Sequence, residues 1–219
     1  MKELYPVMID LAERRVTVVG AGDVALRKVA DLLRCGARVN VIAPSMHEGF
    51  AGLAEEYGDQ LVMIPREYCR GDIGDSLLAF SATDDEEVNR AVFTEARERS
   101  ILVNSADDPS NCSFFLPSSY REGALVMSLS TGGASPAMAA RLRRTLQQHI
   151  PENIDTILEA LNAARQMLKT SAPFLHLDTV RRGEIMKSIV NDDARLEELR
   201  IACEHGDMET CLLGFLSSR

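Results

Sequence analysis

The sequence has no apolar stretch long enough to span a membrane, and its first residues lack the basic-then-apolar order of a secretion signal. It also has no excess of basic residues: 24 Lys and Arg stand against 33 Asp and Glu, which gives a formal net charge of −9. A protein that binds nucleic acid needs a basic surface to neutralise phosphates. We therefore expect a globular protein whose main partner is neither a membrane nor a nucleic acid.

The sequence also lacks a Cys-x-x-Cys pair, and its five cysteines are an odd number. Disulfide frameworks of secreted proteins use paired cysteines, so this pattern predicts reduced thiols and a cytoplasmic location. Cys203 and Cys211 flank His205, but their spacing matches no standard set of metal ligands. We expect these residues to pack along an amphipathic helix, and we predict no metal site.

Strand and helix patterns alternate through the first half of the 219 residues, a length that suits one large core with an appendage or two small domains. Apolar or β-branched runs predict strands at 5–11, 15–19, 38–42, 61–64, 77–81 and 101–104. Helical spacing puts Ala25, Val29, Leu32 and Leu33 on the buried face of one helix, which Gly36 ends, and Val88, Ala91, Val92 and Ala96 on that of another. This order predicts an α/β fold that begins with a Rossmann-like, doubly wound parallel sheet.

The pattern changes after about residue 110. From 124 to 131 apolar and polar residues alternate, with Leu125, Met127 and Leu129 on one face, as in a half-exposed antiparallel strand. Ser135-Pro136 is an N-cap and N1 pair that opens a predicted helix to about His149. From Pro151 onward the pattern is helical, with a stripe of Ile154, Ile157, Leu158, Leu161 and Leu168. A small α+β region and an all-helical C-terminal region are therefore expected after the sheet.

The strand at 15–19 ends in Gly20-Ala21-Gly22-Asp23-Val24-Ala25, and a helix pattern begins at once. Gly20 permits a turn that a Cβ would forbid, Gly22 lets a pyrophosphate approach the main chain, and Ala25 allows close packing of helix on strand. The N–H groups of the first helical turn then face the anion. Because the motif lies between a strand and a helix, we predict a dinucleotide site; a tight turn without a ligand is the alternative.

Ligands of an open parallel sheet bind beyond the carboxyl ends of its strands, and two further loops meet that criterion. Thr83-Asp84-Asp85 follows the strand at 77–81, and we expect Asp85 to cap the next helix. The segment from Asn104 to Pro109 follows the next strand. In it Asp107 and Asp108 either form an Asx-type turn or carry chemistry, and spacing alone leaves both open.

A third loop, at 130–136, consists of small residues and leads into a helix N-terminus. Small residues with free N–H groups at the positive end of a helix are typical of an anion cradle. The helix that follows carries Arg141, Arg143 and Arg144. These arginines either form a solvated face or add positive charge near the cradle.

Together these segments resemble the precorrin-2 dehydrogenases, the module that also forms the N-terminal part of sirohaem synthase. The matching segments are Tyr-Pro-Val-Met-Ile-Asp-Leu (5–11), Val-Val-Gly-Ala-Gly-Asp-Val-Ala-Leu-Arg-Lys (18–28), Ala-Thr-Asp-Asp (82–85), Val-Asn-Ser-Ala-Asp-Asp-Pro (103–109), Ser-Phe-Phe-Leu-Pro-Ser (113–118) and Ser-Thr-Gly-Gly-Ala-Ser-Pro (130–136). They cover roughly the first 150 residues in order, whereas the last 50 or so fit the helical tail of the family only loosely.

The resemblance implies NAD-dependent oxidation of precorrin-2 to sirohydrochlorin and, in some members, insertion of Fe²⁺ to give sirohaem. It places the essential acid/base on Asp107. Because dehydrogenation removes a hydride and a proton, a carboxylate beside the nicotinamide is the group that the chemistry requires. The resemblance also implies a homodimer joined through about 110–150, in line with the apolar alternation of the strand at 124–131.

The expected sites and domains follow from the motifs and the resemblance. The residues expected to bind NAD are Gly20, Ala21, Gly22, Asp23, Val24, Ala25, Ala43, Pro44, Thr83, Asp84 and Asn104. Those expected to bind the carboxylate-rich substrate are Ser130, Thr131, Gly132, Gly133, Ser135 and Arg141. The expected domains are an NAD-binding Rossmann-like domain (1–110), a dimerisation region (111–150) and a helical C-terminal domain (151–219).

The end of the second nucleotide-binding strand departs from the usual pattern. Dinucleotide-binding domains carry Asp or Glu there to bind the adenosine ribose. Here Ile42-Ala43-Pro44-Ser45 contains no acid, and no arginine that would favour a 2′-phosphate. NAD therefore rests on the resemblance, and NADP stays open. The alternative function is a non-catalytic NAD(H)-binding redox sensor, which would leave Asp107 and the 130–136 loop without a role.

Overall fold

A computed structural model describes residues 3–106 and 108–217 of the chain. The chain divides into two compact units, Tyr5–Leu116 and Met1–Leu4 with Pro117–Arg219, and each is described by itself. Within the described residues, no helix has both the length and the apolar character that crossing a bilayer requires.

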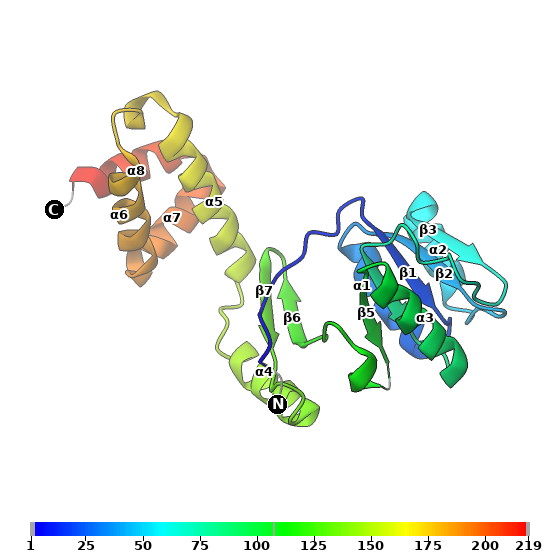
Figure 1. The fold of residues 1–219 in the computed structure, drawn as a ribbon. Helices are drawn as coiled ribbons and strands as arrows, with labels where there is room; N and C mark the ends of the chain where they lie inside the picture. Colours follow the sequence, from blue (N-terminus) through cyan, green and yellow to red (C-terminus); the bar gives the residue numbers. More distant parts are fainter. Residues whose placement is uncertain (1–2, 107, 218–219) are drawn as a thin grey trace. The chain divides into compact units, whose positions relative to one another are not determined.

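The first unit is built on a five-stranded parallel sheet in the order β3-β2-β1-β4-β5 (Figure 1). Its strands are β1 (Arg15–Val19), β2 (Arg38–Ile42), β3 (Leu61–Ile64), β4 (Leu78–Ser81) and β5 (Leu102–Ser105). Its helices are α1 (Asp23–Arg34), α2 (Phe50–Tyr57) and α3 (Glu86–Glu98), with short 3₁₀ turns η1 (Gly58–Gln60) and η2 (Pro109–Asn111). The chain runs outward from β1 to β3 and then returns to place β4 on the other side of β1. The predicted doubly wound fold is confirmed, and its topological switch point lies between β1 and β4.

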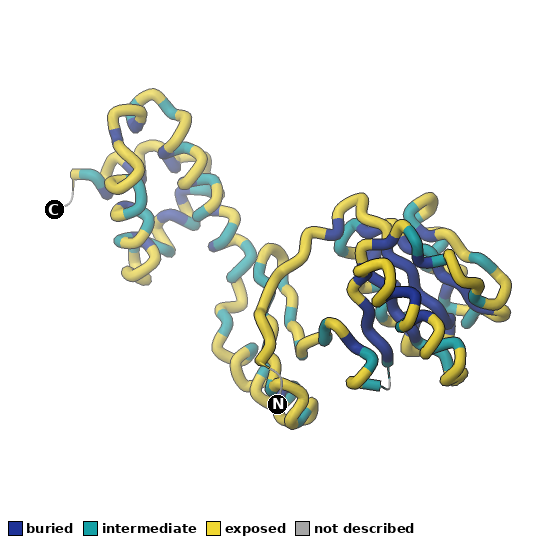
Figure 2. The backbone as a smooth tube through the Cα atoms, viewed as in Figure 1, coloured by how far each residue is buried: buried dark blue, intermediate teal, exposed yellow. Residues whose placement is uncertain are grey.

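The sheet is covered on both faces, which is why its central strands are nearly all apolar. In β1, Val16 and Val18 pack with α1 and α2, whereas Val19 packs with α3 on the opposite face. Each fully buried side chain of this size stabilises the fold by about 1.5–3 kcal/mol. The buried strands stand out in dark blue in Figure 2. The predicted inner face of α1 is also confirmed, because Ala25, Val29, Leu32 and Leu33 are all buried.

Two sequence-based predictions for this unit are wrong. The run at 5–11 forms no strand: it has no ladder partner among the described residues, and Tyr5 and Met8 are exposed. An apolar run becomes a strand only where a neighbouring strand can pair with it. The spacing predicted Ala91 on the buried face of α3, but Ala91 is exposed. Glu95 of the same helix is completely buried.

Glu95 is buried because the loop between β3 and β4 supplies its partners. Tyr68 Oη donates to Glu95 Oε2 at 2.5 Å, and the Gly71 N–H donates to the same oxygen at 2.9 Å. Arg99 Nε lies 2.8 Å from Oε1, an ion pair outside hydrogen-bond geometry. Burial and the bond to Glu95 raise the pKa of Tyr68 above its usual value. The carboxylate therefore fastens this long loop to α3.

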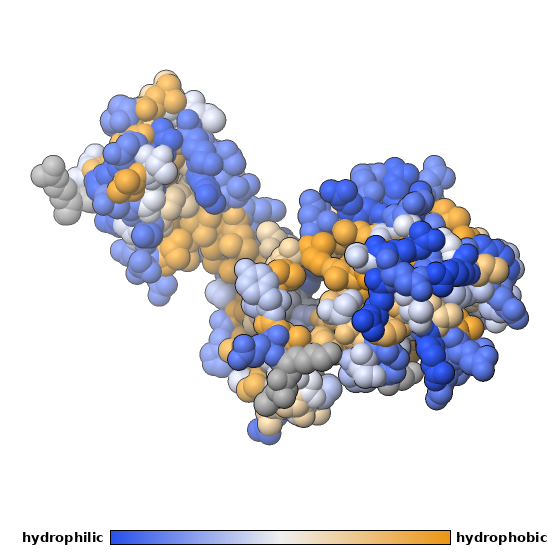
Figure 3. All heavy atoms as spheres, viewed as in Figure 1, coloured by the Kyte–Doolittle hydropathy of each residue, from blue (hydrophilic) through white to orange (hydrophobic). Residues whose placement is uncertain are grey.

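The second unit begins with an antiparallel hairpin, as the alternation at 124–131 predicted. Its strands are β6 (Ser118–Glu122) and β7 (Leu125–Leu129), and α4 (Pro136–Gln147) packs on both. The hairpin turns at Gly123, whose φ of 49° suits glycine. The sequence analysis did not predict β6, because Ser-Ser-Tyr-Arg-Glu lacks an apolar alternation. Figure 3 shows apolar atoms that reach the surface of this unit.

The rest of the second unit is helical, as predicted. It comprises α5 (Ile154–Thr170), η3 (Ala172–Phe174), α6 (Thr179–Val190), α7 (Asp193–His205) and α8 (Met208–Ser217). These helices enclose a separate core that includes Leu168, Phe174, Ile189 and Leu212. Cys211 is buried in this core and Cys203 packs against it, as expected, but the two lie on separate helices, α8 and α7, and not on one. Burial raises the pKa of Cys211 to about 11.

Candidate functional site

The glycine turn after β1 has a geometry that only glycine allows at its first position. Gly20 has a φ of 106°, and its N–H donates to Ile42 O at 2.8 Å. A Cβ on Gly20 would lie 2.1 Å from Ala82 O, which is backbone of the loop after β4. A Cβ on Gly22 would meet nothing within 4 Å. Gly20 is therefore required by packing, whereas Gly22 borders open space.

The N-terminus of α1 is open to an anion. Gly22 is its N-cap residue, and no side chain among the described residues caps it. The helix starts with Leu26 N–H donating to Gly22 O at 2.9 Å, which leaves the N–H groups of Asp23, Val24 and Ala25 for another acceptor. Ala25 is fully buried against the sheet. The open space at Gly22 and these N–H groups fit a dinucleotide pyrophosphate.

The loop after β2 is tied to the glycine turn by two contacts that the sequence analysis did not foresee. His47 N–H donates to Ala21 O at 3.0 Å, and His47 Nε2 lies 3.2 Å from Asp23 Oδ1. Ala43 is buried and Pro44 is exposed. The predicted cofactor residues on these two loops thus lie at the same edge of the sheet, beyond the carboxyl ends of β1 and β2.

The loop after β4 is held by Asn89 of α3. Ser81 Oγ and Thr83 Oγ1 both donate to Asn89 Oδ1, at 2.7 and 3.0 Å, and Asn89 Nδ2 donates to Thr83 O at 2.9 Å. Asp85 is the N-cap of α3 and accepts from the N–H groups of residues 87 and 88, so its predicted capping role is confirmed. Asp84 is exposed beside it.

Asn104, at the end of β5, is buried and uses both ends of its amide. Lys28 Nζ donates to Asn104 Oδ1 at 3.1 Å, and Asn104 Nδ2 donates to Phe114 O at 3.1 Å. The Lys28 ammonium also lies 5.3 Å from the centroid of the Phe80 ring, which packs edge-on against Phe114. Lys28 was missed from the sequence. Its position three residues after Ala25 puts it on the inner face of α1, where a lysine signals a specific partner.

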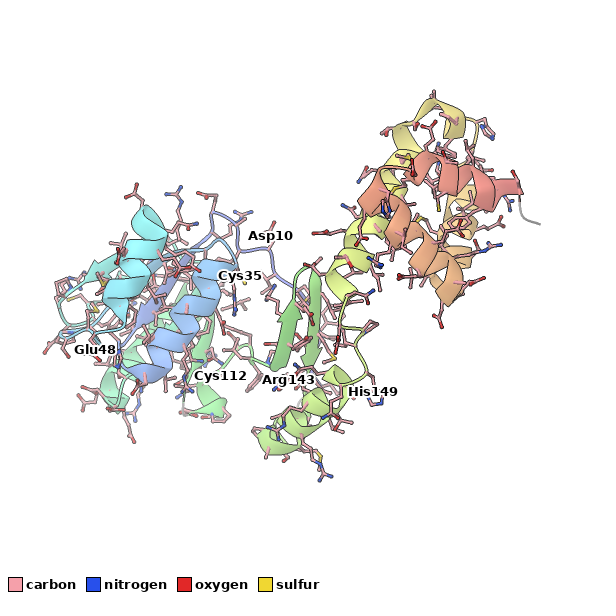
Figure 4. The ribbon with its side chains drawn as sticks, turned by 180° about the vertical axis from the view of Figure 1, so that it is seen from behind. Asp10, Cys35, Glu48, Cys112, Arg143 and His149 are labelled. Carbon is pink, nitrogen blue, oxygen red and sulfur yellow. The ribbon has the colours of Figure 1, made fainter. Side chains whose placement is uncertain are left out.

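In the loop after β5, the side chains of Asp108 and Cys112 accept hydrogen bonds from backbone N–H groups. Asp108 is the N-cap of η2 and accepts from Ser110 N–H at 2.9 Å, and its bonds to Ser110 and Asn111 lower its pKa. Asp108 therefore forms the Asx-type turn. Cys112 Sγ, labelled in Figure 4, accepts from Ser105 N–H at 3.2 Å. Asp107, the predicted acid/base, lies outside the described residues.

The loop at 130–136 belongs to the second unit, whereas the residues described so far belong to the first. Its hydroxyls are engaged with its own backbone: Thr131 Oγ1 accepts from Ser135 N–H at 3.1 Å, and Ser135 Oγ caps α4 by accepting from Met138 N–H at 3.2 Å. Ser130 Oγ accepts from Gly132 N–H at 3.2 Å. The predicted N-cap is confirmed. On α4, Arg141 is exposed and Arg143, labelled in Figure 4, donates to Gln147.

The fold and the glycine turn together define a dinucleotide-binding domain of the Rossmann class, and comparison with known proteins agrees. A family model described as putative NAD(P)-binding matches residues 7–118. A second model, described as sirohaem biosynthesis protein central, matches residues 123–149. The cofactor class is therefore a nicotinamide dinucleotide.

Individual relatives extend the similarity to most of the chain. Siroheme synthase 1 of Pectobacterium atrosepticum is 36% identical over 177 residues, which is 81% of this chain and 36% of that protein. The siroheme synthase of Chromobacterium violaceum is 34% identical over 214 residues, 94% of this chain and 45% of that protein. The chain thus spans less than half the length of these curated relatives.

A solved structure described as SirC, precorrin-2 dehydrogenase, matches this chain nearly end to end. It covers 97% of this chain and 98% of its own, with a TM-score of 0.74 and 27% sequence identity. The chain belongs to the family of the precorrin-2 dehydrogenases, which shares this sequence with siroheme synthases.

Proposed function

We propose that this protein oxidises precorrin-2 to sirohydrochlorin with NAD⁺ in sirohaem biosynthesis. The observation that carries the proposal is the glycine turn, with its uncapped helix and the open space at Gly22, in a chain that matches a precorrin-2 dehydrogenase structure over 97% of its length. We assign NAD binding to 20–25, Ala43, Pro44, Thr83, Asp84 and Asn104. NAD⁺, when bound, supplies the hydride acceptor.

In this proposal Asp107 is the catalytic base. Oxidation of precorrin-2 removes a hydride and a proton, and the Asp107 carboxylate takes the proton and later releases it to water. Two described neighbours support the assignment. The Asp108 carboxylate already accepts from Ser110 in the turn, and the Asn104 amide at the end of β5 accepts from Lys28.

Substrate binding is proposed for the 130–136 loop and Arg141. The substrate carries many carboxylates, and arginine pairs well with that group. Gly132 and Gly133 have positive φ values of 62° and 85°, a conformation that glycine adopts readily and that allows a ligand to approach the backbone closely. Iron insertion into sirohydrochlorin, a lyase activity with Fe²⁺ as substrate, is a second proposed step that uses the same carboxylate.

We further propose a cytoplasmic homodimer with three functional regions. Residues 1–110 bind the cofactor, residues 111–150 form the subunit contact, and residues 151–219 form a helical domain. The exposed apolar side chains Met138, Leu142 and Leu146 on α4 support a contact in the central region. Light scattering of the full chain should report about twice the chain mass of 24.1 kDa. A monomer at high concentration would contradict this assignment.

The function is tested by incubating the full chain with precorrin-2 and NAD⁺ and following the absorbance of NADH and sirohydrochlorin. Asp107→Ala should lower turnover by roughly 100-fold, the scale for loss of a positioned base, and leave NAD⁺ binding unchanged. Asp108→Ala is the matched control and should lower turnover less, because that carboxylate serves the turn. Turnover by Asp107→Ala near the wild-type rate would contradict the catalytic assignment. NAD⁺ binding without any turnover by the wild type would favour a non-catalytic module.

A further inference from the structure

The side chains of Asp23 and His47 meet at the edge of the glycine turn. Asp23 is the first residue of α1, and His47 lies in the loop between β2 and α2. His47 Nε2 is 3.2 Å from Asp23 Oδ1, and the Asp23 side chain is otherwise 85% exposed. A carboxylate in the first helical turn is thus drawn toward the β2 side of the switch point and faces solvent there.

The His47 ring is fixed in both position and tautomer. Gly49 N–H donates to His47 Nδ1 at 3.0 Å, so in the neutral ring the proton resides on Nε2 and points at Asp23. The backbone of His47 is fixed as well, by its N–H bond to Ala21 O. A Cβ on Gly49 would lie 2.6 Å from Leu26 Cδ2, so a larger residue there would displace the Leu26 side chain. The loop therefore presents one donor to one carboxylate.

Through its contact with His47, this carboxylate lies beside the loop that follows β2. The adenosine half of the cofactor binds on the β2 side of the switch point, and an acid at the end of β2 usually binds its ribose hydroxyls. Here the residues after β2 are Ala43, Pro44 and Ser45, and none is acidic. A carboxylate that accepts from ribose hydroxyls also repels a phosphate on the 2′ position.

We propose that Asp23, held by His47, replaces the missing acid after β2, binds the adenosine ribose and discriminates against the 2′-phosphate of NADP. The inference rests on the proposed NAD-dependent function. Asp23 acts as a specificity residue, and His47 is a positioning residue that acts through it.

Direct binding tests the proposal without turnover. Calorimetric titrations of the full chain with NAD⁺ and NADP⁺ give the ratio of the two affinities, and ADP-ribose with and without a 2′-phosphate repeats the measurement for the adenosine half alone. Asp23→Asn should lower the preference for NAD⁺ about tenfold, because it removes one close charge and keeps the side-chain shape. His47→Ala should lower it about threefold, the scale of an exposed polar contact, and His47→Gln should restore it, because its amide can donate from a similar position.

Glu48→Gln is the matched control, because Glu48 is an exposed carboxylate on the same loop (Figure 4). It should leave the ratio unchanged. An unchanged ratio in Asp23→Asn, with circular dichroism and Tm as in the wild type, would overturn the proposal, and so would an equal change in Glu48→Gln. Failure of the wild type to bind either dinucleotide would overturn the proposed function as well, so the two failures are distinguishable.

Discussion

Two loops of this protein have the same sequence character and different chemistry. The turn at 20–25 and the loop at 130–136 both consist of small residues and both lead into a helix N-terminus. The first leaves α1 without a side-chain cap, whereas in the second Ser135 caps α4 and Thr131 accepts from the backbone. The N–H groups at the start of α1 have no side-chain cap and are free to bind an anion. In the second loop, hydroxyls of the loop itself already bind some of the N–H groups. Small residues before a helix therefore offer an anion more free N–H groups where the helix is uncapped than where a side chain caps it.

The largest expected difference between the loops concerns stability. Gly20→Ala should destabilise the fold by about 3 kcal/mol or more, because the new Cβ would lie against the Ala82 carbonyl at a positive φ. Gly133→Ala should cost only about 1–2 kcal/mol, because it meets left-handed strain alone and nothing lies within 4 Å. Urea unfolding followed by circular dichroism measures both. Equal losses in the two variants would show that Gly20 is not fixed by the loop after β4.

The next difference concerns the ligand. Gly22→Asp should weaken NAD⁺ binding roughly 100-fold, because it places a side chain and a negative charge where we propose that the pyrophosphate binds. The protein should still fold, since a Cβ at Gly22 meets nothing within 4 Å and its φ of −82° is ordinary. Gly52→Asp adds the same charge on α2, also in open space, and is the control. Calorimetry that finds wild-type affinity in Gly22→Asp would place the dinucleotide elsewhere.

The smallest difference concerns the cap of α4. Ser135→Ala should lower stability by about 1 kcal/mol, because the Met138 N–H loses its acceptor. Ser130→Ala removes a hydroxyl that serves only an exposed turn, and it should cost less than about 0.5 kcal/mol. Each variant lacks one hydroxyl relative to the wild type, so their Tm values can be compared directly. A larger loss in Ser130→Ala would mean that the loop, and not the cap, holds the start of the helix.

Much of the fold could be predicted because its determinants are local. The strands at 15–19, 38–42 and 61–64 have in the structure the bounds that were predicted, since β-branched runs end there in residues that break a strand. Asp85 and Ser135 were identified as caps for the same reason, because a cap bonds to N–H groups only two or three residues away.

Two features that the sequence analysis did not capture depend on partners far along the chain. The run at 5–11 has strand-like composition, but no strand lies ready to pair with it among the described residues. Glu95, on which the sequence analysis made no prediction, is buried by contacts with Tyr68 and Gly71. In each case a contact that no local pattern encodes decided between exposure and burial.

The sequence by itself determined the parallel sheet, the glycine turn, the helix caps and the resemblance to a family, because these depend on periodicity and on near neighbours. Only the tertiary structure decided how the candidate site is held together. Lys28 and Asn104 are 76 residues apart and meet at 3.1 Å, and Asp23 meets His47 across two elements. Side chains so distant in sequence come together only after the strands have paired and the helices have packed, because that packing alone fixes which loops share an edge of the sheet.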